Sequence, residues 1–344
     1  MPSRARRVFT LQDVAQGADV SLATASRALN GSTRRVREDL RERVLASAAR
    51  LNYSANAQAQ AMARGHTNVV GLLVHDIADP YFSTIAASVM SAADKHHLLV
   101  TIASTRRRSE RELEYVATLR GQRACAVILA GSRTDDSTQI GRLGAELAAF
   151  EDAGGRVALI SQNRLPVDTV MVENRAGART LATELVALGY RRFAVLAGPR
   201  RLLTAKDRAA GFREGLARAG TVLDPADIVP GEFTRDGGYA AMSALLSRGV
   251  DVACVFAVND VMAVGAMAAL RDGGLEMPRD MAVAGFDDIA TLRDVTPALT
   301  TVRLPLGEIG AVALELVTLA QAERPRRRRI KGEVVLRAST PRLR

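Results

Sequence analysis

The sequence predicts two kinds of structure in one chain: an all-α helix-turn-helix headpiece, followed by an α/β body of two doubly wound parallel-sheet lobes. Two short amphipathic segments flank a tight turn near the N-terminus, and from about residue 68 short apolar runs alternate with amphipathic stretches. Strand–helix alternation is typical of parallel sheets covered by helices on both faces. Because the body is too long for one such sheet, we expect two lobes with a ligand cleft at the carboxyl ends of their strands.

Composition excludes several classes of protein. The 344 residues, 48% of them hydrophobic and 24% charged, are typical of a soluble globular chain of two or three domains. We find no apolar run of 18 residues and no apolar region behind the basic N-terminus, so neither a membrane span nor a secretory signal is expected. Cys125 and Cys254 lie far apart in apolar runs, as buried thiols do. We therefore predict a cytoplasmic protein with no membrane partner, metal or cofactor.

The positive charge is concentrated near the N-terminus. The whole chain has a formal net charge of +10, and residues 1–65 hold eleven arginines and five acidic residues, a net charge of +6. A small basic unit on a more neutral body is the electrostatic pattern of a protein that binds DNA phosphates.

This basic segment has the pattern of a three-helix unit. Thr10 is placed to begin a helix whose apolar residues recur at three- and four-residue spacing. Residues 17–20 then form a turn, for which Gly17 supplies an unusual backbone conformation. Ser21 caps a second helix over 22–29, and a third amphipathic helix follows over about 37–51. Two short helices joined by a tight turn predict a helix-turn-helix.

The second helix is short enough to lie in the major groove of DNA. Its exposed residues Leu22, Ala23 and Arg27 are expected to reach base edges. The small hydroxyl residues Ser21, Thr24 and Ser26 are suited to phosphate contacts. The alternative is a small basic three-helix bundle with no role in DNA binding.

Residues 10–30, TLQDVAQGADVSLATASRALN, resemble the headpiece of the lactose-repressor (LacI/GalR) family. That family's motif reads T-[IL]-x-D-V-A-x-x-A-G-V-S-x-x-T-V-S-R-x-[LV]-N. The chain departs from it at Asp19, where glycine is usual, and at Ala25, where valine is usual. The resemblance implies DNA binding and adds Thr10 and Asn30 to the DNA-binding residues.

The resemblance continues into a hinge helix over residues 54–65, where Ala55 replaces the usual proline. It implies four further DNA contacts: Tyr53, Asn56, Ala59 and Met62. Met62 stands where the family places a leucine that wedges into the central base step of the minor groove. Because a helix of about nine residues is marginal alone in water, we expect this segment to fold on DNA and act as a switch. The alternative is an alanine-rich linker.

The body also resembles this family throughout its length. The motifs Asp-Pro-Tyr-Phe at 79–82, Arg-Ala-Ala-Gly-Phe at 208–212, Asn-Asp at 259–260 and Gly-Phe-Asp-Asp at 285–288 carry the likeness. These motifs recur in periplasmic sugar-binding proteins, so the body is periplasmic-binding-protein-like and does not by itself indicate a regulator. The resemblance implies a DNA-binding domain over 1–53, a hinge over 54–67 and an effector-binding domain over 68–344. Its N-lobe would comprise 68–166 and 299–330, and its C-lobe 167–298 and 331–344.

The resemblance implies that these motifs, which lie at predicted strand ends and helix starts, supply candidates for the effector site. Arg208 offers a planar donor fork, Asp287 two acceptor oxygens, and Asn259 both a donor and an acceptor. The alternatives are a solvated helical arginine and turn-capping polar residues. Five further candidates follow from the resemblance or from position: Asp76, Tyr81, Phe82, Gln162 and Phe233. Phe233 is placed to stack on a ligand, with core packing as the alternative for all three aromatic residues, and Gln162 stands where the family often has arginine.

Other charged runs are expected to be structural. The four arginines at 326–329 indicate a solvated loop between lobes, and 106–108 a loop before a helix. The histidines lack zinc-ligand spacing with the cysteines.

These patterns favour a homodimeric, sequence-specific transcription regulator, a repressor by family tendency, that binds an inverted-repeat DNA operator under control of a small molecule. A sugar or sugar derivative is the expected effector, with a purine or other metabolite as the alternative. The chain leaves no room for a heptad tail after 334–337, so a dimer rather than a tetramer is expected. A solute-binding protein without DNA function is the second hypothesis. An enzyme is the third, and the sequence has no G-x-S-x-G motif, P-loop or supported carboxylate pair to favour it.

Overall fold

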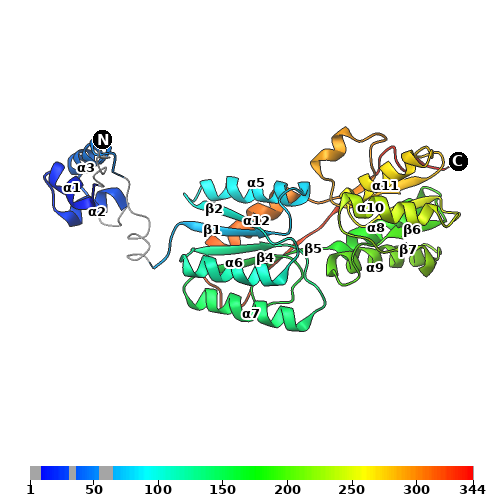
Figure 1. The fold of residues 1–344 in the computed structure, drawn as a ribbon, viewed down its shortest axis with the longest axis horizontal. Helices are drawn as coiled ribbons and strands as arrows, with labels where there is room; N and C mark the ends of the chain where they lie inside the picture. Colours follow the sequence, from blue (N-terminus) through cyan, green and yellow to red (C-terminus); the bar gives the residue numbers. More distant parts are fainter. Residues whose placement is uncertain (1–8, 31–35, 54–64, 344) are drawn as a thin grey trace, which may run out of the picture. The chain divides into compact units, whose positions relative to one another are not determined.

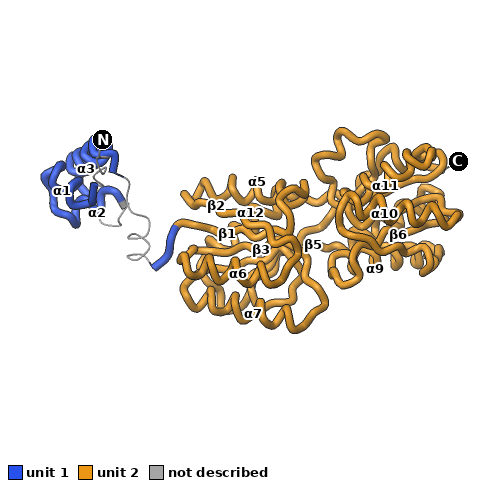
Figure 2. Tube along the Cα trace, in the orientation of Figure 1, with its two compact units in different colours: residues 1–67 blue, residues 68–344 orange. Residues whose placement is uncertain are grey.

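The computed structural model describes residues 9–30, 36–53 and 65–343, and the chain divides into two compact units, Met1–Thr67 and Asn68–Arg344 (Figure 2). The predicted hinge contacts Asn56, Ala59 and Met62 lie outside the described residues. None of the described helices has the length and apolar character needed to span a bilayer.

The described part of the first unit contains three helices, α1 (Leu11–Gly17), α2 (Leu22–Asn30) and α3 (Glu38–Arg50). They enclose a small core that includes Val14, Ala25 and Val44. Thr10 starts α1 with a capping box: its hydroxyl accepts from the Asp13 amide, and the Asp13 carboxylate accepts from the Thr10 amide at 2.7 Å. The predicted helix-turn-helix is therefore present.

The turn between α1 and α2 differs from the prediction in one respect. The residue with a left-handed backbone is Asp19, with φ of +52°, and Gly17 is the last residue of α1. A Cβ on Gly17 would lie 2.5 Å from the Ser47 hydroxyl, which donates to the Val14 carbonyl. The packing of α3 against α1 thus requires glycine at position 17, and Asp19 adopts the strained backbone conformation of the turn.

The first lobe of the second unit is a parallel six-stranded sheet with helices on both faces (Figure 1). Its strands run in the order β11-β5-β4-β3-β1-β2. Their bounds are β1 Val69–Val74, β2 Leu99–Ser104, β3 Ala126–Ala130, β4 Arg156–Ile160, β5 Asp168–Val172 and β11 Arg327–Ile330. One face is covered by α5 (Pro80–Asp94) and α12 (Leu306–Thr318), the other by α6 (Ser109–Gly121) and α7 (Ser137–Asp152). The apolar runs form strands here because helices bury them from both sides.

The second lobe has a parallel four-stranded sheet in the order β7-β6-β8-β9. The strands are β6 Phe193–Leu196, β7 Ile228–Val229, β8 Cys254–Ala257 and β9 Ala282–Ala284. Its helices are α8 Asn174–Ala187, α9 Leu203–Arg218, α10 Arg235–Leu246 and α11 Asp260–Asp272, with short 3₁₀ turns at Pro225–Asp227 and Ala290–Asp294. Helix α8 packs on α9, and α10 packs on α11. Both lobes have the predicted doubly wound architecture.

The chain crosses between the lobes three times: after β5, along β10 (Thr301–Arg303) and along β12 (Glu333–Val335), which pairs antiparallel with β10. The Asp288 carboxylate links the crossing segments that contain β10 and β12, because it accepts from the guanidinium groups of Arg303 and Arg337, both at 2.7 Å.

The predicted lobe boundaries need two corrections. Strand β5 pairs with β4 in the first sheet, so the C-lobe begins at about residue 174 and not at 167. Thr300 bridges to Ala284, and its amide donates to Ser339, so the chain near 299–300 belongs to the C-lobe. The N-lobe resumes only near α12. The sequence shows the strands but not their pairing partners, which set these boundaries.

The prediction that the arginines at 326–329 form a loop is also wrong, because residues 327–330 form the edge strand β11. The strand pairs in parallel with β5. Asp168 fixes its start by accepting from the Arg326 amide at 2.7 Å and from the Arg326 guanidinium at 3.1 Å. Strand β11 tolerates charged side chains because it lies at the edge of the sheet, where one side of the strand is open to solvent.

Candidate functional site

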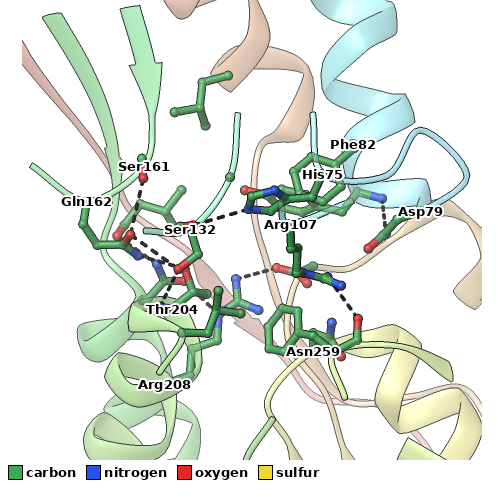
Figure 3. A pocket seen from close by; sticks show the side chains of 18 residues that line it. His75, Asp79, Phe82, Arg107, Ser132, Ser161, Gln162, Thr204, Arg208 and Asn259 are labelled. Atoms are coloured by element: carbon green, nitrogen blue, oxygen red, sulfur yellow. Dashed lines mark hydrogen bonds and ion pairs between the residues drawn. The ribbon is translucent and has the colours of Figure 1, made fainter. Parts of the chain in front are cut away.

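A pocket with about 570 Å³ of space between atoms, part of it open to solvent, lies between the two lobes of the body (Figure 3). First-lobe lining residues follow strand ends: His75 follows β1, Ser132 closely follows β3, and Gln162 closely follows β4. Asn259 and Asp287 occupy the equivalent places after β8 and β9 in the second lobe. The pocket therefore lies at the carboxyl edges of two parallel sheets, where such folds bind ligands.

Arg208 of α9 is the centre of the second-lobe wall and is only 2% exposed. Its guanidinium donates to Asp287 at 2.7 Å, to the Asn174 side-chain oxygen at 2.8 Å and to the Val258 carbonyl at 2.8 Å. It also lies 3.9 Å from the centre of the Phe286 ring, a cation–π contact. These three bonds use three of its five N–H groups. Arg208 is thus a buried, oriented donor and not a solvated helical arginine.

Asp287 and Asn259 both line the pocket. Burial raises the pKa of Asp287 to about 7, against the opposing effect of the Arg208 charge. Its backbone has φ of +123°, a conformation that costs energy in a non-glycine residue. Asn259 caps α11, since its side-chain oxygen accepts from the Met262 amide at 3.0 Å. The capping interpretation of Asn259 is therefore correct, and its amide nitrogen has no partner among the described residues.

The apolar part of the wall consists of aromatic rings together with Ile160, Val172 and Leu202. Phe82 is buried in the first-lobe core and also lines the pocket, with its ring edge-to-face against Tyr81 at 5.0 Å. Phe233 enters from the second lobe. The Arg107 guanidinium lies 5.7 Å from the centre of the Phe233 ring and donates to the Phe233 carbonyl at 3.2 Å. This contact joins the two lobes across the pocket.

His75 forms part of the first-lobe wall as a neutral imidazole. Burial, reinforced by the charges of Arg133 and Arg107, lowers its pKa to about 3. Its ring nitrogens lie 3.3 Å from the Thr105 hydroxyl and 3.3 Å from the Ser132 carbonyl. Gly131 makes room for it: a Cβ there would collide with the imidazole, and its φ of +152° disfavours other residues.

Gln162 ties the two lobes together on one side of the pocket (Figure 3). Its side-chain nitrogen donates to the Thr204 hydroxyl at 2.8 Å, and its oxygen accepts from the Arg133 amide at 2.9 Å. The Thr204 amide donates to the Ser132 hydroxyl at 2.9 Å. Near the surface, Asp135 forms ion pairs with Arg201 and Lys206 of the other lobe.

Seven of the eight predicted effector residues line this one pocket: Tyr81, Phe82, Gln162, Arg208, Phe233, Asn259 and Asp287. The eighth, Asp76, does not; it is exposed, and its carboxylate accepts from the Ala78 amide at 3.0 Å. Sequence reasoning missed several lining residues: His75, Asp79, Arg107, Ser132, Asn174 and Thr204. A position directly after a predicted strand was the available signal for His75.

The first unit exposes one face of α2. Leu22 is 50% exposed, and Ala23 and Arg27 are also exposed. The hydroxyls of Ser21 and Thr24 lie 2.8 Å apart, and Ser21 caps the helix by accepting from the Thr24 amide. Ser26 is half-buried, and Tyr53 packs against the small core. The side chain of Asn30, the last residue of α2, is outside the described part of the chain.

Across the described ranges, no three histidine, cysteine, aspartate or glutamate side chains gather where they would hold a metal ion. The fold and the site together define a class of protein: a helix-turn-helix unit joined to a two-lobed body with a polar pocket between its lobes. Residues 10–56 match the model of bacterial regulatory proteins of the lacI family, and residues 182–340 match a periplasmic binding protein-like domain.

Relatives and solved structures agree with this class. The chain is 34% identical to the HTH-type transcriptional regulator GalS of Salmonella typhimurium strain LT2 over 313 residues, 90% of this chain and 89% of the relative. It is 30% identical to the HTH-type transcriptional repressor CytR of Escherichia coli K12, over 90% of this chain and 88% of that one. The lac repressor dimer bound to operator and the anti-inducer ONPF has a TM-score of 0.84 at 27% identity, covering 97% of this chain and 100% of the other. The transcriptional regulator CelR in complex with cellobiose has a TM-score of 0.71 at 30% identity, covering 96% and 99%.

The chain belongs to the lacI family of bacterial regulatory proteins. It is a DNA-binding transcription regulator, which confirms the predicted family, fold class and function. Its curated relatives are regulators of transcription and not enzymes. The headpiece match excludes the hypothesis of a solute-binding protein without DNA function.

Proposed function

We propose that this regulator acts in the cytoplasm as a homodimeric repressor on an inverted-repeat operator, with a polyhydroxylated small molecule as its effector. One observation carries the effector proposal: the buried network of Arg208, Asp287 and Asn174 opens into a pocket lined from both lobes. A small molecule in that pocket would contact both lobes at once.

The pocket chemistry favours a sugar or sugar derivative. The second Asp287 oxygen can accept hydrogen bonds, while the remaining Arg208 N–H groups and the Asn259 amide can donate them. Donors and acceptors placed side by side match vicinal hydroxyls. Phe233 supplies an apolar face for the ring of the ligand. A purine is the second candidate, because Phe233 is equally able to stack on a base.

The proposed mechanism uses the two lobes as a switch. A ligand that contacts both lobes stabilises one angle between them, and it shifts the equilibrium only by its difference in affinity for the two arrangements. In the dimer this would change the spacing of the two hinge segments, 54–67, and therefore their ability to fold on DNA with Met62 in the minor groove. A dimer is proposed because one headpiece reads only one half-site.

The test starts from selection of duplexes from a random DNA pool by the full-length protein, with and without a panel of sugars and purines. An enriched inverted repeat whose binding changes with one compound is the expected result. Asp287→Asn should keep operator affinity and lose the response to the compound. Asp94→Asn, an exposed change of the same kind on α5, should keep both. Failure to enrich any repeat would overturn the operator proposal, and an unaltered response in Asp287→Asn would overturn the effector site.

A further inference from the structure

A second hollow adjoins the effector pocket and is lined mainly from the first lobe. It encloses about 620 Å³ between atoms, part of it open to solvent, and we call it the basic chamber. The chamber and the effector pocket share four lining residues: His75, Arg107, Ser132 and Leu202. Figure 3 shows three of these, His75, Arg107 and Ser132, in the wall of the effector pocket. The two spaces are therefore neighbours that share part of a wall.

The charge of the basic chamber is strongly positive. Four arginines line it, Arg107, Arg108, Arg133 and Arg142, against one carboxylate, Glu112. Glu112 is committed to Arg133, at 2.7 Å, and both side chains are largely buried. Arg108 and Arg142 have no acidic partner among the described residues.

Arg107 is the arginine that both spaces share. It lies in the field of the Asp79, Glu232 and Asp76 carboxylates, and burial still lowers the pKa of its guanidinium. The charge of Arg107 is therefore partly balanced from the effector side. The arginines of the chamber without an acidic partner in the described part of the chain are Arg108 and Arg142, both of which are exposed to solvent.

Two of the arginines that line the chamber have a buried side-chain nitrogen without a hydrogen-bond partner in the part of the chain that the structure describes. The buried Nε atoms of Arg107 and Arg133 have no partner within the described residues, and Arg133 is only 6% exposed. Buried polar atoms without partners are costly, so such atoms indicate a missing acceptor. The hydroxyls of Thr105, Ser109 and Thr134 also line this space, and each is hydrogen-bonded to a side chain: to His75, Glu110 and Gln139 respectively.

The N-terminus of α6 contributes to the same wall. Arg108 is its N-cap and makes no side-chain cap, and Ser109 begins the helix and lines the chamber. The first-turn amides of a helix carry partial positive charge and favour an anion. Together with the guanidinium groups, they match the three acceptor oxygens of a phosphate.

We propose that the basic chamber binds a phosphate group, and that the effector is a phosphate ester whose uncharged part lies against Arg208 and Asp287. The second half of this inference rests on the proposed function of the effector pocket; the first half does not. His75 lies between the two spaces as a neutral imidazole, so it adds no charge of its own to the site.

The first experiment titrates inorganic phosphate into the full-length protein by isothermal calorimetry. Arg142→Ala and Arg108→Ala should each raise the phosphate dissociation constant at least threefold. Arg111→Ala is the matched control, because it removes the same charge from α6 at a residue that does not line the chamber. Equal binding by wild type, Arg142→Ala and Arg108→Ala, or equal weakening by Arg111→Ala, would overturn the chamber and assign the phosphate to the basic surface in general.

The second experiment compares hexose phosphates and nucleoside monophosphates with their parent hexoses and nucleosides. One phosphate ester should bind at least tenfold more tightly than its parent, and Arg142→Ala should reduce its affinity to that of the parent. Asp287→Asn should weaken both compounds. Phosphate binding that requires Arg142, with no ester preferred over its parent, would assign the chamber to free phosphate and overturn the ester.

The two proposals fail separately in these assays. In one outcome, a neutral hexose binds only when Asp287 is present and alters DNA binding, while phosphate binding is unchanged in Arg108→Ala and Arg142→Ala. This outcome would overturn the basic chamber but not the effector pocket. Phosphate binding that requires Arg142, with no compound altering DNA binding, would support the chamber and overturn the proposed effector control.

Discussion

We expect the side chains of Arg208 and Asp287, which form a buried ion pair, to contribute to the free energy of unfolding as a coupled pair. Its atoms lie 2.7 Å apart, and the two side chains are 3% and 6% exposed, so water screens the pair little. Removing one partner of a buried pair costs about 3–5 kcal/mol, because the other charge stays buried without compensation. In Asp287→Asn the guanidinium keeps its bonds to Asn174 and Val258 and its contact with Phe286. We therefore expect the lower end, about 3 kcal/mol.

Arg208→Met removes the positive charge and retains most of the apolar stem. It leaves the Asn174 oxygen, the Val258 carbonyl and Asp287 each without one donor. The pKa of Asp287, already raised to about 7 by burial, should rise further, so the carboxyl protonates instead of remaining a bare buried charge. The cost should again be about 3 kcal/mol.

The double variant separates the pair from its surroundings. Urea unfolding followed by circular dichroism, for wild type, both single variants and the double variant, gives the coupling as the departure from additivity. We expect about 2 kcal/mol at pH 7.5, within the range measured for residues that share a network. A coupling below about 0.5 kcal/mol would mean that the two side chains act independently, and it would refute the argument.

Four further predictions follow from single residues. Burial raises the pKa of Asp260 to about 6, so the folded state binds a proton at Asp260 more tightly than the unfolded state does. The stability that this proton contributes is fully present below about pH 4 and should be lost as the pH rises through about 6. Asp260→Asn should flatten this slope in urea titrations from pH 4 to 7, and an unchanged slope would assign it to other groups. Asp19→Gly should stabilise the first unit by about 1 kcal/mol, because glycine tolerates a φ of +52°, and a lower melting temperature for the headpiece would contradict this. Gly131→Ala should displace His75 and weaken effector binding at least tenfold in calorimetry, while operator affinity without effector stays unchanged. Arg27→Ala should cost about 1–3 kcal/mol in operator affinity and relax specificity at one base position, whereas a uniform loss across all sequences would indicate a phosphate contact instead.

The sequence by itself determined the elements and the class of the protein. Apolar runs such as 126–130 are buried on both faces of a sheet, so their hydrophobicity marks them as strands without any knowledge of neighbours. The headpiece motif determines its own local structure, because the caps at Thr10 and Ser21 bond to amides three residues away. Asn259 and Asp287 were predictable because they follow strand ends and lie in family motifs, and Arg208 was predictable only through the family motif at 208–212.

Only the tertiary structure decided what depends on distant partners. Strand β5 belongs to the first lobe because it pairs with β4, and 327–330 form a strand because β5 offers them an edge. Arg107 in the loop 106–108 became a pocket residue only through its contact with Phe233, which is distant in sequence. The basic chamber likewise assembles arginines from three separate segments of the first lobe. Periodicity and capping act over a few residues, whereas pairing, lobe boundaries and pocket walls depend on contacts between segments far apart in the chain.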